Sequence, residues 1–110
     1  MWTGLFGNAT AEKVLLYLER YGEGYSMGIA KTFELPVSQI QRQLLRFEAA
    51  GILISQTLGR VRVFLWNPRC YFLRELKATL GRIHQFLPRE VEMRFFLNRK
   101  RPRRTGKPLR

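Results

Sequence analysis

Apolar residues recur at spacings of three and four through the first fifty positions, and this period is typical of amphipathic helices. A first helix is predicted to end near Tyr21, with Asn8 or Thr10 as its cap. Its apolar positions are Ala11, Val14, Leu15 and Leu18. A short second helix is predicted from Ser26 up to Pro36, because the residue before a proline disfavours the α region.

The third predicted helix runs from Val37 to Ala50 and has two chemically distinct faces. Gly51 can supply the left-handed conformation that commonly ends a helix. The residues expected to face the core are Val37, Ile40, Leu44 and Phe47. The outward face has hydrogen-bond donors and no acid before Glu48. It is expected to comprise Ser38, Gln39, Gln41, Arg42, Gln43 and Arg46.

Beyond the third helix the sequence becomes rich in β-branched and aromatic residues, which are typical of strands. Two strands are predicted, residues 52–57 and 61–66, and the short link between them favours a hairpin. Arg60 and Arg62 lie at and just past the tip of this hairpin. This order of elements, helix, tight turn, helix and basic hairpin, is typical of a winged helix-turn-helix domain. In such a domain the helix after the turn, here the third predicted helix, enters the major groove of DNA.

A long fourth helix is predicted from Pro68 to about Leu87, with Asn67 as its possible cap and Pro88 at its end. Its apolar stripe consists of Phe72, Leu73, Leu76, Leu80, Ile83 and Leu87. A further short helix is predicted over residues 89–98. The predicted fold class is therefore mainly α with a β-hairpin wing, that is, a winged helix-turn-helix with a three-helix core and a long C-terminal helix.

Size and charge divide the chain into a body and a tail. With 110 residues, 45% of them hydrophobic, the chain has the size of one domain. Of the formal net charge of +12, residues 99–110 contribute seven Lys or Arg and no acid, which leaves thirteen basic and eight acidic residues, or +5, for residues 1–98. We expect a DNA-binding domain over 1–98 and a disordered tail over 99–110. Such a charge attracts DNA, RNA or an acidic membrane surface.

The segment 35–53 carries a likeness to a known family. Its polar helix start is followed by Leu44 and Phe47, which form a Leu-x-x-Leu type of step, and then by Ala50-Gly51-Ile52. This order resembles winged helix-turn-helix transcriptional regulators of the ArsR type and, more distantly, the MarR-like regulators. Two other segments resemble the same family, namely Leu5 to Leu18 and the exit from the wing at Asn67-Pro68. The resemblance covers roughly residues 5–87 and implies a DNA-binding regulator.

Side chains that present two polar groups in one plane are predicted to read base edges, since Gln pairs with adenine and Arg with guanine. The predicted base-reading residues are Gln39, Arg42 and Gln43. The residues predicted to contact the DNA backbone are Ser38, Gln41 and Arg46 on the helix and Gln56, Arg60 and Arg62 on the wing. A solvated polar helix face and an ordinary polar hairpin tip are the alternatives.

The tail is predicted to contact phosphates through its basic side chains, and it is expected to add affinity rather than specificity. These residues are Arg99, Lys100, Arg101, Arg103 and Arg104. The alternatives are RNA contact and a solubilising disordered end.

A homodimer is expected, because a single recognition helix reads too few base pairs for tight specific binding. The resemblance implies a dimer surface made of the opening segment and the fourth helix. Its expected residues are Leu5, Phe6, Leu73, Leu76, Leu80, Ile83 and Leu87. Core packing is the competing explanation for the same stripe.

Other chemistry has little support in the sequence. Metal-sensing relatives use clusters of Cys, His and acidic residues, whereas this chain has one Cys (Cys70), one His (His84) and no Asp, so we predict no metal and no cofactor. No nucleophile has a base nearby, and we predict no enzyme. We expect a soluble, cytoplasmic protein without membrane contact. The leading hypothesis is a sequence-specific regulator that binds double-stranded DNA. The alternative is an RNA-associated or protein-interaction accessory module that uses the tail for nucleic-acid contact.

Overall fold

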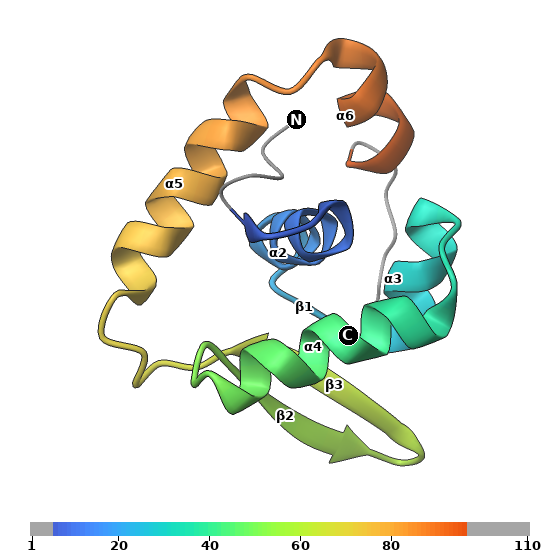
Figure 1. The fold of residues 1–110 in the computed structure, drawn as a ribbon, viewed down its shortest axis with the longest axis vertical. Helices are drawn as coiled ribbons and strands as arrows, with labels where there is room; N and C mark the ends of the chain where they lie inside the picture. The colour runs from blue at the N-terminus through green and yellow to red at the C-terminus, as the bar shows by residue number, and fades with distance from the viewer. Residues whose placement is uncertain (1–5, 97–110) are drawn as a thin grey trace.

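One helix lies at the centre of the fold, and the other elements pack around it (Figure 1). The computed structural model describes residues 6–96. The central helix is α2 (Ala9–Tyr21), and the surrounding helices are α3 (Ser26–Phe33), α4 (Val37–Ala49), α5 (Leu73–Gln85) and α6 (Arg89–Phe95). The predicted cap at Asn8 is confirmed, because its side chain accepts a hydrogen bond of 2.7 Å from the Ala11 amide. Gly51 has a φ of 82°, so the predicted left-handed end of α4 is also confirmed.

The predicted hairpin is present and belongs to a three-stranded antiparallel sheet. Strands β2 (Leu53–Leu58) and β3 (Val61–Trp66) are joined by a two-residue turn in which Gly59 has a φ of 64°. The third strand, β1 (Glu23–Gly24), was not predicted, and it pairs with β3 at Leu65 and Phe64. The strand order is β1-β3-β2, so a segment between α2 and α3 ties the hairpin to the helical body.

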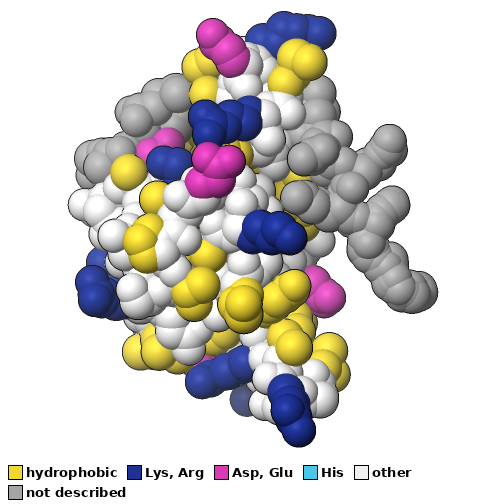
Figure 2. Space-filling view, turned by 90° about the vertical axis from the view of Figure 1, so that its right-hand side faces the viewer, with side chains coloured by type: hydrophobic (Ala, Val, Ile, Leu, Met, Phe, Trp, Pro, Cys, Tyr) yellow, Lys and Arg dark blue, Asp and Glu magenta, His cyan; other side chains and the backbone are white. Residues whose placement is uncertain are grey.

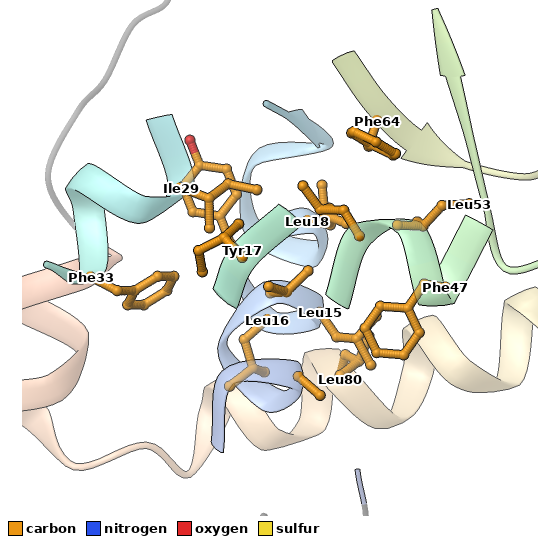
Figure 3. Packing of buried hydrophobic residues seen from close by; sticks show 14 of the residues in the cluster. Leu15, Leu16, Tyr17, Leu18, Ile29, Phe33, Phe47, Leu53, Phe64 and Leu80 are labelled. Atoms are coloured by element: carbon orange, nitrogen blue, oxygen red, sulfur yellow. The ribbon is translucent and has the colours of Figure 1, made fainter. Parts of the chain in front are cut away.

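The core lies between α2 and the elements around it (Figure 3). Four consecutive residues of α2, from Leu15 to Leu18, are buried, because this helix is covered on several sides. Phe64 of β3 is fully buried and joins the sheet to this cluster. The other labelled residues in Figure 3 are Ile29 and Phe33 of α3, Phe47 of α4, Leu53 of β2 and Leu80 of α5.

Three expectations about the helices are wrong. Val37 does not face the core but is 41% exposed. The first three residues of α4 are all exposed, and the buried face of this helix begins only at Ile40. The helix predicted to begin at Pro68 begins instead at Leu73. Asn67 caps a turn: its Oδ1 accepts from the Arg69 amide, and its Nδ2 donates to the Gly51 carbonyl at 2.8 Å. The short C-terminal helix ends at Phe95 rather than near residue 98.

Much of the apolar stripe on α5 belongs to the core of a single chain. Leu80, Ile83 and Leu87 are buried among residues of α2 and the neighbouring elements. Leu73 and Leu76 are partly buried against the same core, as is Phe6. The competing core-packing explanation therefore accounts for most of this stripe. Within residues 6–96, no helix has both the length and the apolar character that crossing a lipid bilayer requires.

Gly24 is a position where the sheet comes too close to the helices for a side chain. A Cβ at this residue would lie 2.8 Å from Tyr17 Cε1 and 3.0 Å from Ile29 Cδ1, both of them in the core. We expect Gly24→Ala to lower the free energy of unfolding by about 1–3 kcal/mol, because a packed core resists an inserted methyl group. Urea unfolding followed by circular dichroism measures this change.

Gly81→Ala is the matched control for this substitution. Its Cβ would meet Glu19 Oε2 at 3.6 Å, which is an ordinary contact. Since Gly81 lies within α5, alanine there is expected to raise the free energy of unfolding by up to about 1 kcal/mol. Equal unfolding midpoints for Gly24→Ala and the unchanged protein would contradict the close packing of β1.

Alkaline pH is expected to destabilise the fold through Tyr17. Burial raises the pKa of its phenol to about 12, and the neighbouring phenols of Tyr21 and Tyr25 add to this effect. The unfolded phenol has a pKa of 10.0, so this contribution to stability is complete below pH 10 and is lost as the pH rises toward about 12. Tyr17→Phe keeps the ring but removes the titration. Its unfolding midpoint should therefore fall less steeply with pH than that of the unchanged protein, and parallel curves would refute this role for Tyr17.

Candidate nucleic-acid interface

The outward face of α4 carries the side chains expected to meet DNA. Ser38, Arg42 and Arg46 follow one another at intervals of four residues, so they lie along one side of the helix, and all three are exposed. Gln39 is exposed beside them, and Gln41 is half-buried at the edge. The first turn of α4 contains no acidic residue. The helix therefore presents hydrogen-bond donors of three kinds, hydroxyl, amide and guanidinium, to the solvent.

Gln43 does not belong to this face. Its side chain is only 8% exposed, and its Oε1 is buried without a hydrogen-bond partner. A side chain in this position cannot place its amide on a base edge, so the expected base-reading role of Gln43 is corrected. The helical spacing itself indicates this burial, since Gln43 lies three residues after Ile40 and four before Phe47, both of which are buried.

Two residues of the α4 face are positioned by neighbouring parts of the chain. Thr10 Oγ1 of α2 donates a long hydrogen bond of 3.5 Å to Gln39 Oε1, which leaves the amide nitrogen of Gln39 as a donor and the second lone pair of Oε1 as an acceptor. The Arg46 guanidinium lies 5.2 Å from the centre of the Phe47 ring, and its Nη2 would be 3.9 Å from a Cβ at Gly7. The start of α2 and the segment before it thus flank the exposed side of α4.

The hairpin is the second basic element of this region. Figure 2 shows the side of the molecule on which α3 and the hairpin tip lie, with Lys and Arg side chains at its lower end, where the hairpin projects. Gln56 and Arg60 are exposed on the hairpin, as a nucleic-acid contact requires. From Ala49 to Arg74 the chain has four Arg and no acid. Leu58 and Val61, on either side of the turn, are also exposed.

Arg62 differs from the other predicted wing contacts because its guanidinium is hydrogen-bonded to other side chains of the protein. Its Nη2 donates to Glu48 Oε1 at 2.7 Å, and its Nε donates to Ser55 Oγ at 3.0 Å. Glu48 lies in the last turn of α4, and Ser55 lies on β2. The sequence predicts Arg62 to contact the DNA backbone, and no local pattern reveals a partner fourteen residues away.

The predicted phosphate contacts of the tail, Arg99 to Arg104, lie outside the described residues, as does Leu5 of the predicted dimer surface. The end of the described chain packs against α3. Phe95 and Phe96 pack on Phe33 of α3, with ring centroids 4.9 and 5.8 Å away. Arg94 Nη2 donates to Glu34 Oε1 at 3.0 Å. Because Glu34 belongs to the turn between α3 and α4, the described chain ends beside the helix-turn-helix.

A metal-binding arrangement is not found in the part of the chain that the structure describes. Residues 6–96 contain no group of three or more His, Cys, Asp or Glu side chains able to hold a metal ion. His84 instead meets a backbone carbonyl, that of Leu16, with its Nε2 at 2.8 Å, and its ring packs edge-on against Phe96. His84 therefore packs α5 against α2, through Leu16, and against Phe96 at the end of α6.

Comparison with known proteins yields a match of fold. No protein-family model and no curated protein matches the chain. Three similar solved structures are a mutant of ZitR from Lactococcus lactis (14% identity, TM-score 0.56), YusO from Bacillus subtilis (19%, 0.56) and a MarR family transcriptional regulator from Rhodococcus sp. RHA1 (22%, 0.56). The matches cover 80%, 83% and 84% of this chain and 62%, 71% and 73% of those chains. The chain thus spans less than two thirds of ZitR. These likenesses confirm the predicted winged helix-turn-helix fold.

Proposed function

We propose that the chain is a sequence-specific, double-stranded DNA-binding transcription regulator. The observation that carries this proposal is the exposed side of α4, on which Ser38, Gln39, Arg42 and Arg46 point to solvent beside a basic hairpin. In a winged helix-turn-helix this helix enters the major groove, where such side chains meet bases and phosphates. The solved structure from Rhodococcus, described as a transcriptional regulator, adds support from the fold. The resemblance to the ArsR type rests on the sequence alone, whereas the Rhodococcus structure belongs to the MarR family. We assign no reaction to the chain and propose that it acts in the cytoplasm.

The roles on α4 follow from exposure and side-chain chemistry. Gln39 and Arg42 are the proposed base readers, because each presents two polar groups in one plane and both are exposed. Ser38, Gln41 and Arg46 are the proposed backbone contacts of the helix. On the hairpin, Gln56 and Arg60 are exposed and are proposed to contact the flanking backbone or minor groove.

The basic tail is proposed to bind phosphates on the same duplex. Its seven basic residues begin at Arg99, four positions after α6 ends at Phe95, and the end of α6 is held against Phe33 and Glu34. Since Glu34 lies in the turn that precedes the first residues of α4, a chain leaving this point starts close to the proposed DNA surface. The Arg94 pair also offsets an acidic charge next to that surface.

A homodimer is part of the proposal, because two-fold symmetry doubles the number of base pairs that are read. The surface differs from the one expected from the sequence, since Leu80, Ile83 and Leu87 are buried in the core. The exposed apolar side chains nearest to α5 in sequence are Tyr71, Phe72 and Phe86, and partly buried Leu73 and Leu76 lie between them. These residues are the proposed surface.

Selection of bound fragments from random duplex DNA tests the proposal. We expect one enriched sequence with two-fold symmetry, because each protomer would present the same face of α4. Enrichment of a motif without symmetry would retain specific DNA binding but refute the dimer. If no motif is enriched and RNA competes equally for binding, the accessory-module alternative replaces the proposed function.

A further inference from the structure

Glu48, Ser55 and Arg62 form a closed ring of hydrogen bonds between α4 and the hairpin. Arg62 Nη2 donates to Glu48 Oε1 at 2.7 Å, and Ser55 Oγ donates to Glu48 Oε2 at 2.7 Å. Arg62 Nε completes the ring by donating to Ser55 Oγ at 3.0 Å. Both oxygens of the carboxylate are therefore used, and the three residues come from α4, β2 and β3.

The environment of this ring favours its persistence. The side chains of Arg62 and Glu48 are 46% and 27% exposed, so the pair is partly shielded from water. The Arg62 guanidinium also lies 5.2 Å from the centre of the ring of Phe64, which is fully buried. Hydrogen bonds between charged partners are roughly twice as strong as neutral ones. The guanidinium is thus held from two directions, by a carboxylate and by an aromatic face.

The negative charge of Glu48 would be unfavourable at this position without its ion pair with Arg62. Glu48 lies in the last turn of α4, where the helix dipole opposes a negative charge. It is also the one acid of α4, next to a surface proposed to approach phosphates. Arg62 offsets both effects because it neutralises the carboxylate at the point where α4 meets the hairpin.

We propose that Arg62 is a positioning residue, which Glu48 and Ser55 hold in place so that the hairpin keeps a fixed orientation relative to α4. This inference rests on the proposed function, in which α4 and the hairpin contact one DNA duplex. Arg62 then acts through the geometry of the hairpin, and it is not a phosphate ligand. Arg60, two residues away and exposed at the turn, is left as the arginine that meets DNA.

The substitution Glu48→Gln distinguishes Arg62 as a positioning residue from Arg62 as a phosphate ligand, because the two roles predict opposite changes in the affinity for DNA. If Arg62 positions the hairpin, loss of the carboxylate charge loosens the hairpin, and we expect binding of a labelled duplex to weaken by about two- to tenfold. If Arg62 is a phosphate ligand, the same change frees its guanidinium and removes an acid, so binding becomes tighter. Tighter binding by Glu48→Gln would overturn the proposal.

Salt dependence gives a second readout, with Arg60→Ala as the matched control. A residue that neutralises one phosphate contributes about 0.9 to the slope of log K against log salt concentration. We expect Arg60→Ala to lower the slope by about this amount and Arg62→Ala to leave it unchanged while weakening binding. The double variant Glu48→Gln/Arg62→Ala should bind no more weakly than the weaker single variant, because both changes break one bridge. A lower slope for Arg62→Ala would overturn the proposal.

Amide hydrogen exchange in the absence of DNA tests the bridge independently of the proposed function. Hairpin amides of residues 53–66 are expected to exchange about two- to tenfold faster in Glu48→Gln and Arg62→Ala and at the original rate in Arg60→Ala. Unchanged exchange in the first two variants would overturn the bridge even if DNA binding is found. Failure of the unchanged protein to bind any duplex, with faster exchange in these variants, would overturn the proposed function and leave the bridge in place.

Discussion

Replacing both Gln39 and Arg42 by alanine is expected to remove most of the sequence preference of the protein for DNA. Each side chain can form two hydrogen bonds with one base, and such a pair contributes about 1–3 kcal/mol of discrimination against the wrong base. Loss of both should therefore reduce the ratio of specific to non-specific affinity by roughly thirtyfold or more. Titrating an enriched duplex and a scrambled duplex with each variant measures this ratio.

The double variant should keep its fold, because Gln39 and Arg42 are exposed on α4. The matched control replaces one exposed Arg and one exposed Gln that lie outside α4 and the basic stretch 49–74, as Arg20→Ala/Gln85→Ala. We expect this control to retain the full preference. If the variant of α4 discriminates between the two duplexes as well as the control does, α4 is not the recognition helix.

Removal of residues 99–110 is expected to reduce the salt dependence of binding more than any single substitution. The tail has seven basic residues, and at about 0.9 per neutralised phosphate they can contribute at most about six to the slope of log K against log salt concentration. Affinity should fall for every duplex alike, since phosphate contacts carry no sequence information. Fluorescence anisotropy over a series of salt concentrations gives both quantities.

A second variant separates the charge of the tail from its length. It keeps all 110 residues but carries R99Q, K100Q, R101Q, R103Q and R104Q. The slope should fall by at most about 4.5, because five of the seven charges are removed. Retained preference with a smaller slope supports the regulator hypothesis. Loss of all nucleic-acid binding on deletion of the tail would favour the accessory module, in which the winged helix is only a scaffold.

The parts of the fold that the sequence predicts well depend on local chemistry. Asn8 caps α2 and Gly51 ends α4 through contacts within a few residues, and the two-residue turn of the hairpin needs only Gly59 and its neighbour. Apolar spacing also identified the helices that build the core. Each of these features is determined by residues that are close in sequence, so pattern and propensity are sufficient.

The features that the sequence did not predict depend on contacts between distant residues. Strand β1 has only two residues, and its partner Leu65 lies 42 positions after Glu23. Asn67 was predicted to cap a helix, but its side-chain Nδ2 donates a hydrogen bond to the carbonyl of Gly51. For the candidate site, exposure confirmed the placement of Gln39 and Arg42 on the outward face of α4. The burial of Gln43 and the pairing of Arg62 with Glu48 depend on the assembled fold.

The short strand β1 makes the connection between α2 and α3 unsuitable for insertions. Surface loops generally tolerate changes of length, but here the link from Gly22 to Tyr25 contributes a strand to the sheet that carries the hairpin. One added residue would reverse which side of the strand each side chain faces and would push a Cβ into the space kept open at Gly24. Homologous chains should therefore vary in length at the hairpin tip or beyond α6 but keep this link constant.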